Sequence, residues 1–347
     1  MFIINDLHIG ARRTGGTTPA SREALRDYLL TRIQELFDQA ARSNQGHVVI
    51  AGDLFDDFEV DTRDFIAAYQ ILSGWLTGPC RTLTLIAGNH DHSPRGSKMS
   101  SFHALAEILA GAFGNRVHVL PIGRHGWVDP ILGVYAVAHC PNQDLFDQAL
   151  SEVPADVKWL LLHANLDNNF AVESDHSLNV SAEQAKAFND AGIALVFAHE
   201  HQARTGADGW LVVMGNQVPT SIADCLGNNE KFAHVIDEGG LRQLQVWSAR
   251  DSFVDVPWHD LAGAEGQFIR VSGTATAAQA SDVVNTIAAF RQRSDAFVVS
   301  NAVRVEGIVD VQDLPEKFEA AKVFDVMEFI LSHLDADEAE VVKGLLN

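Results

Sequence analysis

The sequence predicts a mixed α/β (α+β) fold in which two sheets are flanked by helices and are followed by a small α/β unit and C-terminal helices. Strand-like apolar runs alternate with segments of helical periodicity through the first two thirds of the chain. Beyond Phe232 the chain changes to strands and turns, and the pattern breaks around residues 263–266. These observations favour two layers of sheet, each covered by helices, over a single parallel sheet.

The strands are predicted from apolar runs that are bounded by turn residues. In the first two thirds of the chain they cover residues 1–4, 48–50, 83–87, 117–120, 134–138, 159–162, 194–198 and 211–214. Later strands are predicted at residues 235–236, 244–246, 253–254, 268–271 and 297–305.

The helices are predicted from apolar residues that recur on one face. This spacing occurs over residues 25–40, 65–76, 102–109 and 283–290. Ser181 and Gln184 form a capping box, which predicts the start of another helix. Two short helices are expected after Pro315, the second capped by Asp335.

Length and composition limit the class of protein. A chain of 347 residues predicts about two domains, and no apolar stretch approaches the length of a membrane span. The three cysteines lack Cys-x-x-Cys spacing and no signal peptide is recognisable, so we expect a cytoplasmic protein without a membrane partner. The formal net charge of -21 argues against a protein that coats nucleic acid through bulk electrostatics.

Metal-competent side chains follow five of the predicted strands, at the point where each strand ends. In an open α/β sheet, ligands lie outside the carboxyl ends of the strands. The five clusters are Asp6 with His8, Asp53, Asn89 with His90, His163, and His199 with His201. An isolated His or Asp at a strand end is more often a hydrogen-bonded structural group. Five such clusters at strand ends are improbable as independent accidents.

Together these side chains predict a site for two metal ions. Mixed imidazole, carboxylate and amide ligands suit Mn²⁺, Fe²⁺ or Zn²⁺. We expect two Mn²⁺, with Mg²⁺, Fe²⁺ or Zn²⁺ as alternatives, and Asp53 as the bridging carboxylate. Paired metal ions clamp the attacking and leaving oxygens of a displacement at phosphorus. His90 then remains as the general acid, with Asp91 placed to orient it.

The same motifs resemble those of the calcineurin-like metallophosphoesterases. The motifs are residues 6–10, 52–56, 88–91, His163 and residues 199–201. Within that superfamily the sequence is most similar to the SbcD nuclease, also known as the meiotic recombination eleven nuclease. Three features are typical of this branch: the Gly-Asp-Leu-Phe-Asp motif at 52–56, Glu200 between the paired histidines, and the loop at 215–221.

The resemblance implies a role for each site residue. One metal would be held by Asp6, His8, Asp53 and His201, and the second by Asp53, Asn89, His163 and His199. His90 would protonate the leaving oxygen of the scissile phosphodiester. The chain departs from the family at Ala198, where Gly is usual, and at Asn216, where Ser is commoner.

The resemblance also implies a metallophosphoesterase sandwich, three domains and several partners. Residues 1–260 would form the metallophosphoesterase (nuclease) domain and residues 265–310 a capping domain that binds DNA. Residues 313–347 would form a helical segment that docks on an SbcC-like ATPase. A homodimer is expected, as in the branch.

Basic residues follow two of the metal motifs. Arg12 and Arg13 follow the first motif, and Arg95 and Lys98 follow the third. Against the acidic background we interpret them as DNA-binding residues that guide the phosphate backbone, with solvated loop charge as the alternative.

The first hypothesis is therefore a manganese-dependent DNA nuclease, with exonuclease or endonuclease activity, in DNA repair, recombination or end processing. A phosphatase or cyclic-nucleotide phosphodiesterase with the same metal centre is the first alternative. It is disfavoured because such chains usually lack the trailing cap and docking helices. A scaffold without turnover is the second, and it is disfavoured because every expected ligand and His90 are present.

Overall fold

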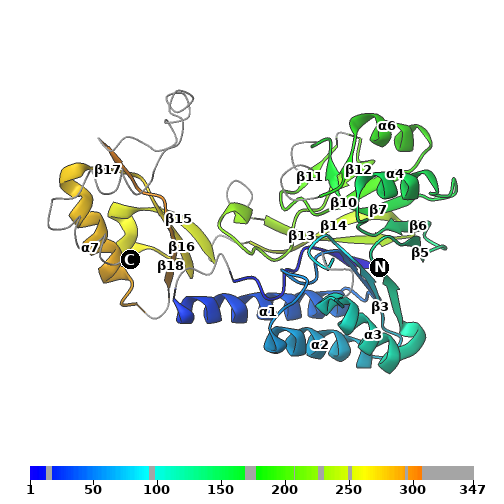
Figure 1. The fold of residues 1–347 in the computed structure, drawn as a ribbon, viewed down its shortest axis with the longest axis horizontal. Coiled ribbons are helices and arrows are strands. Elements are labelled where there is room, and N and C mark those ends of the chain that lie inside the picture. Colours follow the sequence, from blue (N-terminus) through cyan, green and yellow to red (C-terminus); the bar gives the residue numbers. More distant parts are fainter. Residues whose placement is uncertain are drawn as a thin grey trace, which may run out of the picture. The chain divides into compact units, whose positions relative to one another are not determined.

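The computed structural model describes residues 1–12, 18–93, 98–168, 177–206, 208–225, 230–248, 252–293 and 296–306. Within these residues two six-stranded sheets dominate, and smaller sheets of three and two strands follow or flank them. Figure 1 shows that helices lie on the outer sides of the two large sheets. The predicted mixed α/β fold of two sheets flanked by helices is therefore confirmed. The predicted C-terminal helices lie outside the described residues.

The first sheet is mixed and carries three helices. Its strands, in spatial order, are β14 (Gly240–Ser248), β13 (Glu230–Asp237), β1 (Phe2–Ile4), β2 (His47–Ala51), β3 (Thr82–Ile86) and β4 (Val117–Leu120). β1 to β4 are parallel, whereas β13 is antiparallel to both β1 and β14. The helices are α1 (Pro19–Arg42), α2 (Thr62–Thr77) and α3 (Ser101–Phe113). Each helix begins at a polar cap residue (Thr18, Asp61 or Ser100) whose side chain accepts a backbone N–H.

The second sheet has the same plan. Its strands, in spatial order, are β11 (Arg204–Thr205), β12 (Leu211–Val213), β10 (Ala194–Ala198), β7 (Trp159–His163), β6 (Val134–Val137) and β5 (His125–Asp129). The four central strands are parallel and the two edge strands are antiparallel to their neighbours. Its helices are α4 (Gln143–Ser151) and α6 (Ala182–Asp190), and α6 begins with the predicted capping box of Ser181 and Gln184. Outside this sheet, β8 (Asn165–Leu166) pairs with β9 (Asn179–Val180).

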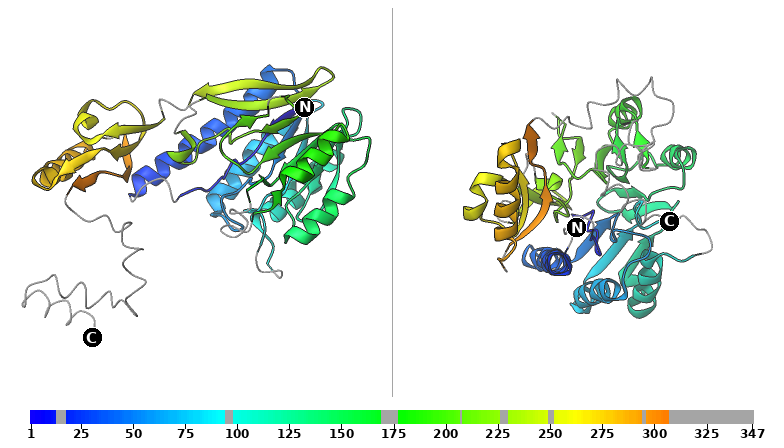
Figure 2. Two further views of the ribbon diagram at one scale, coloured as in Figure 1. Left: turned by 90° about the horizontal axis from the view of Figure 1, so that it is seen from above. Right: turned by 60° about the vertical axis from the view of Figure 1, so that its left-hand side comes forward.

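Alternation along the strands builds two apolar cores. On β7, Leu161 joins the core that contains the first sheet, whereas Leu160 and Leu162 face the second core with α4 and α6. β10 repeats this pattern, with Val196 in the first core and Phe197 in the second. Because successive side chains of a strand point to opposite faces, both faces of the second sheet are buried. Figure 2 shows the resulting layers from two further directions.

A small parallel sheet follows the two large ones. It consists of β15 (Phe253–Pro257), β16 (Phe268–Ser272) and β18 (Phe297–Asn301), and α7 (Ala280–Phe290) connects β16 to β18. The prediction of a single strand at residues 297–305 is wrong, because the chain forms two strands there. β18 pairs with β16, whereas β19 (Arg304–Glu306) pairs with β17 (Thr274–Thr276). Between them, Ala302 N–H donates to the Val271 carbonyl, and the Asn301 side chain accepts Val303 N–H.

The described chain divides into two compact units. One consists of Met1–Gly273 with Val284–Val303, and the other of residues 274–283 and 304–306. The three domains proposed from the sequence remain predictions. Among the described residues, no helix is both long enough and apolar enough to cross a lipid bilayer.

His234 on β13 predicts a loss of stability in acid. It is fully buried, and burial lowers its pKa from 6.5 to about 4. The unfolded chain therefore binds a proton at His234 below pH 6.5, whereas the folded chain does so only below about pH 4. The stabilisation is fully present above pH 6.5 and is lost as the pH falls towards 4, by about 3 kcal/mol.

His234→Gln should remove this component of the pH dependence. Urea unfolding of the metal-free protein between about pH 7 and pH 4 measures it as the difference between wild type and variant. His259→Gln, at an exposed position, is the matched control and should keep the wild-type slope. Equal slopes for wild type and His234→Gln would contradict the prediction.

Candidate metal centre

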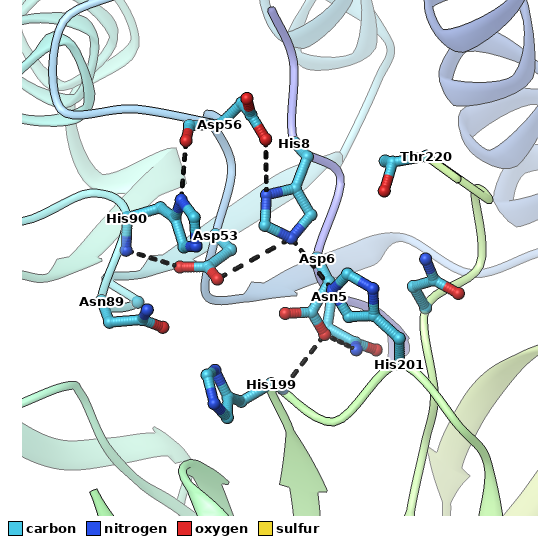
Figure 3. A network of polar contacts seen from close by, with 12 residues as sticks. Asn5, Asp6, His8, Asp53, Asp56, Asn89, His90, His199, His201 and Thr220 are labelled. Carbon is cyan, nitrogen blue, oxygen red and sulfur yellow. Dashed lines mark hydrogen bonds and ion pairs between the residues drawn. The ribbon is translucent and has the colours of Figure 1, made fainter. Parts of the chain in front are cut away.

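The polar clusters predicted at five strand ends converge on one place in the structure. Loops after β1, β2 and β3 of the first sheet meet the ends of β7 and β10 of the second. Figure 3 shows side chains from these loops turned towards one another. The cavity between them, of about 370 Å³, is lined by His8, Asp53, Asp56, His90, His199, His201 and Thr220.

On one side of the centre, Asp6, His8 and His201 bring one ligand atom each within 4.8 Å of one another. The Nε2 atoms of His8 and His201 lie 3.1 Å apart. The two rings come from different sheets, so only the packing of the sheets brings them together.

On the other side, Asp53, His163 and His199 form a second such group. His163 Nε2 lies 3.3 Å from Asp53 Oδ2 and 2.9 Å from Asn89 Oδ1, which adds the predicted amide ligand. Asp53 Oδ2 also lies 3.9 Å from His8 Nε2. One carboxylate oxygen therefore faces both groups, which is the arrangement that a bridging ligand needs.

The His90 ring lines the cavity, and its centre lies 4.9 Å from that of the His8 ring. Its Nδ1 is 2.6 Å from the Asp56 carbonyl oxygen, and its backbone N–H donates to Asp53 Oδ1 at 3.0 Å. A carbonyl only accepts, so Nδ1 carries the proton and Nε2 is left for the cavity. His90 also lies close enough to His8 and Asp53 to form a third potential ligand group with them.

Asp91 has a different position from the one expected for a residue that orients His90. Its carboxyl group is buried and accepts backbone N–H groups from Gly88 at 3.0 Å, Phe55 at 3.3 Å and Leu54 at 3.4 Å. Burial and the nearby charge of Asp53 raise its pKa to about 7. Asp91 therefore ties the loop after β3 to the loop after β2, and the Asp56 carbonyl orients the His90 ring.

Four of the seven predicted ligands have left-handed backbone conformations. The φ angles are 50° at Asp6, 43° at His8, 49° at Asp53 and 82° at His199. Non-glycine residues rarely adopt positive φ, and such strain concentrates at functional sites. Backbone hydrogen bonds from Asp6 N–H to Gly52 O and from His8 N–H to Asp53 O, each 3.1 Å long, hold two of these turns.

Two glycines allow the ligand loops to approach closely. A Cβ atom on Gly88 would lie 2.2 Å from Asp53 Oδ1, and one on Gly52 would lie 2.0 Å from His163 Nδ1. Any side chain at either position would displace a ligand. Ala198, at the family's usual glycine, is a buried β10 residue paired with His163, so its methyl group is accommodated.

The centre favours positive charge. Burial alone would lower the pKa of His163, but the Asp53 carboxylate raises it to about 9. Burial would also lower the pKa of His201, but the Asp224 carboxylate raises the pKa of this histidine to about 9. Although burial acts to raise the pKa of Asp53, His163, His8 and His90 hold it well below its usual range. The site therefore retains protons or cations on its imidazole side chains.

The residues present fit divalent cations. Asp6 Oδ1 is buried and has no hydrogen-bond partner among the described residues, which is costly for a carboxylate unless a cation lies beside it. The facing Nε2 atoms of His8 and His201 could both offer lone pairs to such an ion. Nitrogen and oxygen donors of this kind suit Mn²⁺, Fe²⁺ and Zn²⁺.

Sequence reasoning missed the residues that support the ligands. Asp224 Oδ1 accepts from His201 Nδ1 at 2.9 Å, and Asn5 donates to Asp6 and to the Gly215 carbonyl. Asp224 follows the loop at 215–221 that resembles the SbcD branch, and Asn5 precedes the first motif. Position next to a motif was the only available signal, because neither residue belongs to a recognised pattern.

The described residues of the predicted DNA-binding set are paired with carboxylates. Arg12 Nη2 lies 3.1 Å from Asp64 Oδ2 and 3.3 Å from Asp61 Oδ2, and Lys98 Nζ pairs with Glu59. Their charge is thus partly compensated within the chain. Arg13 and Arg95 lie outside the described residues.

Comparison with known families identifies this architecture. The calcineurin-like phosphoesterase family matches residues 1–203, which include every predicted metal ligand. The chain belongs to the calcineurin-like phosphoesterase family. It is therefore a metallophosphoesterase, a hydrolase of phosphoester bonds, and the family implies two divalent metal ions.

Two solved structures are similar in part. The first is the protein TT1561 of Thermus thermophilus, with 14% identity and a TM-score of 0.41, covering 71% of this chain and 97% of that one. The second is a dimetal phosphatase from Danio rerio, with 11% identity and a TM-score of 0.33, covering 71% and 98%. Both TM-scores are below 0.5, so neither likeness bears on the activity of this chain. A search of curated proteins found no match.

Gly88→Ala should disrupt the centre, because the added Cβ would overlap the Asp53 carboxylate. We expect at least a tenfold loss of Mn²⁺ affinity, measured by titration calorimetry and by metal content after reconstitution. Gly111→Ala is the matched control, since nothing lies within 4 Å of a Cβ there. It should bind metal normally and gain up to about 1 kcal/mol of stability, as alanine replaces glycine in a helix. Normal Mn²⁺ binding by Gly88→Ala would refute the predicted geometry.

Proposed function

We propose that this metallophosphoesterase is a metal-dependent DNA nuclease subunit, working as a homodimer with an SbcC-like ATPase in DNA repair, recombination or end processing. The observation that carries the hydrolytic chemistry is the pair of ligand groups that Asp53 Oδ2 faces, at 3.9 Å from His8 Nε2 and 3.3 Å from His163 Nε2, with His90 nearby. Phosphodiesters of DNA are one substrate class that such a centre serves.

The side chains have separate tasks in this proposal. Asp6, His8, Asp53 and His201 would hold one cation, and Asp53, Asn89, His163 and His199 the other. Two bound cations supply positive charge for the attacking and leaving oxygens of the phosphodiester. Burial acts to lower the pKa of His90, but the Asp53 carboxylate raises it, which favours the imidazolium form. In that form Nδ1–H donates to the Asp56 carbonyl, and Nε2–H would give its proton to the leaving oxygen in the cavity.

Two features support the DNA-processing branch. Glu200, typical of that branch, accepts the Leu166 N–H at 2.8 Å and pairs with Arg204, so it fixes the loop that follows His163. The chain also continues well beyond the phosphoesterase match into the strand–helix–strand unit of β16, α7 and β18. We assign this unit to the capping domain that would contact DNA.

Hydrolysis of a small phosphoester is the second candidate. The net charge is -21, and carboxylates already pair with Arg12 and Lys98, which weakens the attraction of these two residues for a long polyanion. A phosphatase or cyclic-nucleotide phosphodiesterase would need less positive charge to bind its substrate. The metal centre itself serves either substrate.

The direct test gives the Mn²⁺-loaded protein linear duplex DNA, a cyclic nucleotide and a phosphoprotein in parallel, with and without the ATPase partner. We expect DNA to be degraded, and His90→Asn should reduce cleavage at least a hundredfold while the protein keeps two Mn²⁺. The reason is that a general acid contributes rate and not metal affinity.

The other outcomes are equally decisive. Hydrolysis of the small ester alone would refute the nuclease proposal and support the second candidate. If no ester were hydrolysed, a scaffold would be favoured. Loss of Mn²⁺ in His90→Asn would mean that the group of His8, Asp53 and His90 binds the metal.

Removing the residues after Pro315 tests the proposed association with the ATPase. The truncated chain should keep its Mn²⁺ content, because every proposed ligand precedes that point, but it should no longer co-purify with an SbcC-type ATPase. Size-exclusion chromatography of the co-expressed pair measures this. Unchanged association would contradict the docking role of the C-terminal segment.

A further inference from the structure

Lys231 on β13 is a buried cation behind the metal centre. Its side chain is only 4% exposed, and no ion pair joins it to a carboxylate among the described residues. Its ammonium donates instead to Asn216 Oδ1 at 2.9 Å and to the Asp224 backbone carbonyl at 2.8 Å. Burial lowers its pKa, and the charge of Asp224 opposes this. A buried ammonium with two neutral acceptors is unfavourable for folding, so its position suggests another use.

The contacts of Lys231 fix the orientation of a buried amide. An ammonium group can only donate, so Asn216 must turn Oδ1 towards Lys231. The amide nitrogen then faces the other way and donates to Asp224 Oδ2 and to the Val218 carbonyl, both at 3.1 Å. Asn216 itself is 1% exposed, so it acts inside the protein and not on a substrate.

The two oxygens of the Asp224 carboxylate have different partners: Oδ2 is held by the surrounding loop, and Oδ1 contacts His201. In addition to the Asn216 amide, Oδ2 accepts the Thr220 N–H at 2.8 Å, the Thr220 hydroxyl at 3.0 Å and the Ser221 N–H at 3.0 Å. Oδ1 therefore points at Nδ1 of His201, 2.9 Å away. With its proton on Nδ1, His201 directs Nε2 towards His8 and the cavity.

The two sides of the centre differ in this respect. Among the described residues, the partner of His163 Nδ1 is the neutral Ala51 carbonyl, 3.1 Å away. His201 has a carboxylate, and behind the carboxylate an amide and a buried ammonium. A carboxylate behind a metal-binding histidine orients the ring and strengthens it as a ligand.

We propose that Lys231 is a positioning residue for one of the two metal sites: through Asn216 and Asp224 it locks the His201 imidazole against Asp6 and His8, so that this side binds its cation more tightly than the side of His163 and His199. The inference rests on the ligand assignment of the proposed function. It does not depend on whether the substrate is DNA.

The test measures Mn²⁺ binding without any substrate. Titration calorimetry of the wild-type full chain should resolve two Mn²⁺ of unequal affinity. Lys231→Met keeps the length of the side chain but removes the charge, and it should weaken the tighter site at least tenfold while the weaker site stays unchanged. At limiting metal the wild type should give the Mn²⁺ electron paramagnetic resonance spectrum of a single bound ion, and Lys231→Met should show less bound and more free Mn²⁺.

A double-mutant cycle separates positioning from a general loss of packing. If Lys231 acts through Asp224, then Lys231→Met should have little further effect on Mn²⁺ affinity in an Asp224→Asn background. Ile236→Ala, at a fully buried position on the same strand, is the control and should lower stability without changing either affinity. Should Lys231→Met fail to fold, Asn216→Ser breaks the same connection and should weaken the same site.

The failures are distinguishable. Wild-type affinities at both sites in a folded Lys231→Met or Asn216→Ser variant would overturn this inference and leave the metal centre standing. An additive effect in the Asp224→Asn background would also overturn it. Failure of the wild type to bind Mn²⁺ would overturn the ligand assignment as well, whereas two bound Mn²⁺ without DNA cleavage would affect only the nuclease proposal.

Discussion

The buried carboxylate of Asp53 is the constraint on which the rest of this structure depends. It is 1% exposed, and its Oδ2 lies between the imidazole groups of His163 and His8. An anion in such a place is stable only with positive charge around it, whether carried by protons on histidine or by metal ions. The two sheets must therefore meet so that histidines of the second sheet reach a carboxylate of the first.

The backbone of the ligand loops is strained to satisfy this constraint. Asp6, His8 and Asp53 all have positive φ, and Gly52 and Gly88 leave no room for side chains beside the ligands. Such conformations persist only where their surroundings hold them. Here the loops after β1 and β2 are hydrogen-bonded to each other, and Asp91 ties the loop after β3 to the loop after β2.

Behind the ligands, the two sides of the centre are built differently. His163 is supported by a backbone carbonyl, which any sequence can supply. His201 is supported by Asp224, Asn216 and Lys231, which are buried polar side chains and are each costly to place in a core unless they are paired. A polar network of this kind is specified by the side chains themselves, so single substitutions in it should change the affinity for the metal.

The sequence by itself determined the mixed α/β fold, the two sheets and the five strand-end clusters, because apolar periodicity and the residues that follow each strand are local properties of the chain. It could not determine which backbone atoms Asp91 contacts, that Arg12 and Lys98 have carboxylate partners, or that the strand at 297–305 is two strands. Nor could it relate Lys231 to His201, which lie on different elements and are connected through Asn216 and Asp224. Those features depend on which side chains meet when the sheets pack, and only the tertiary structure decides that.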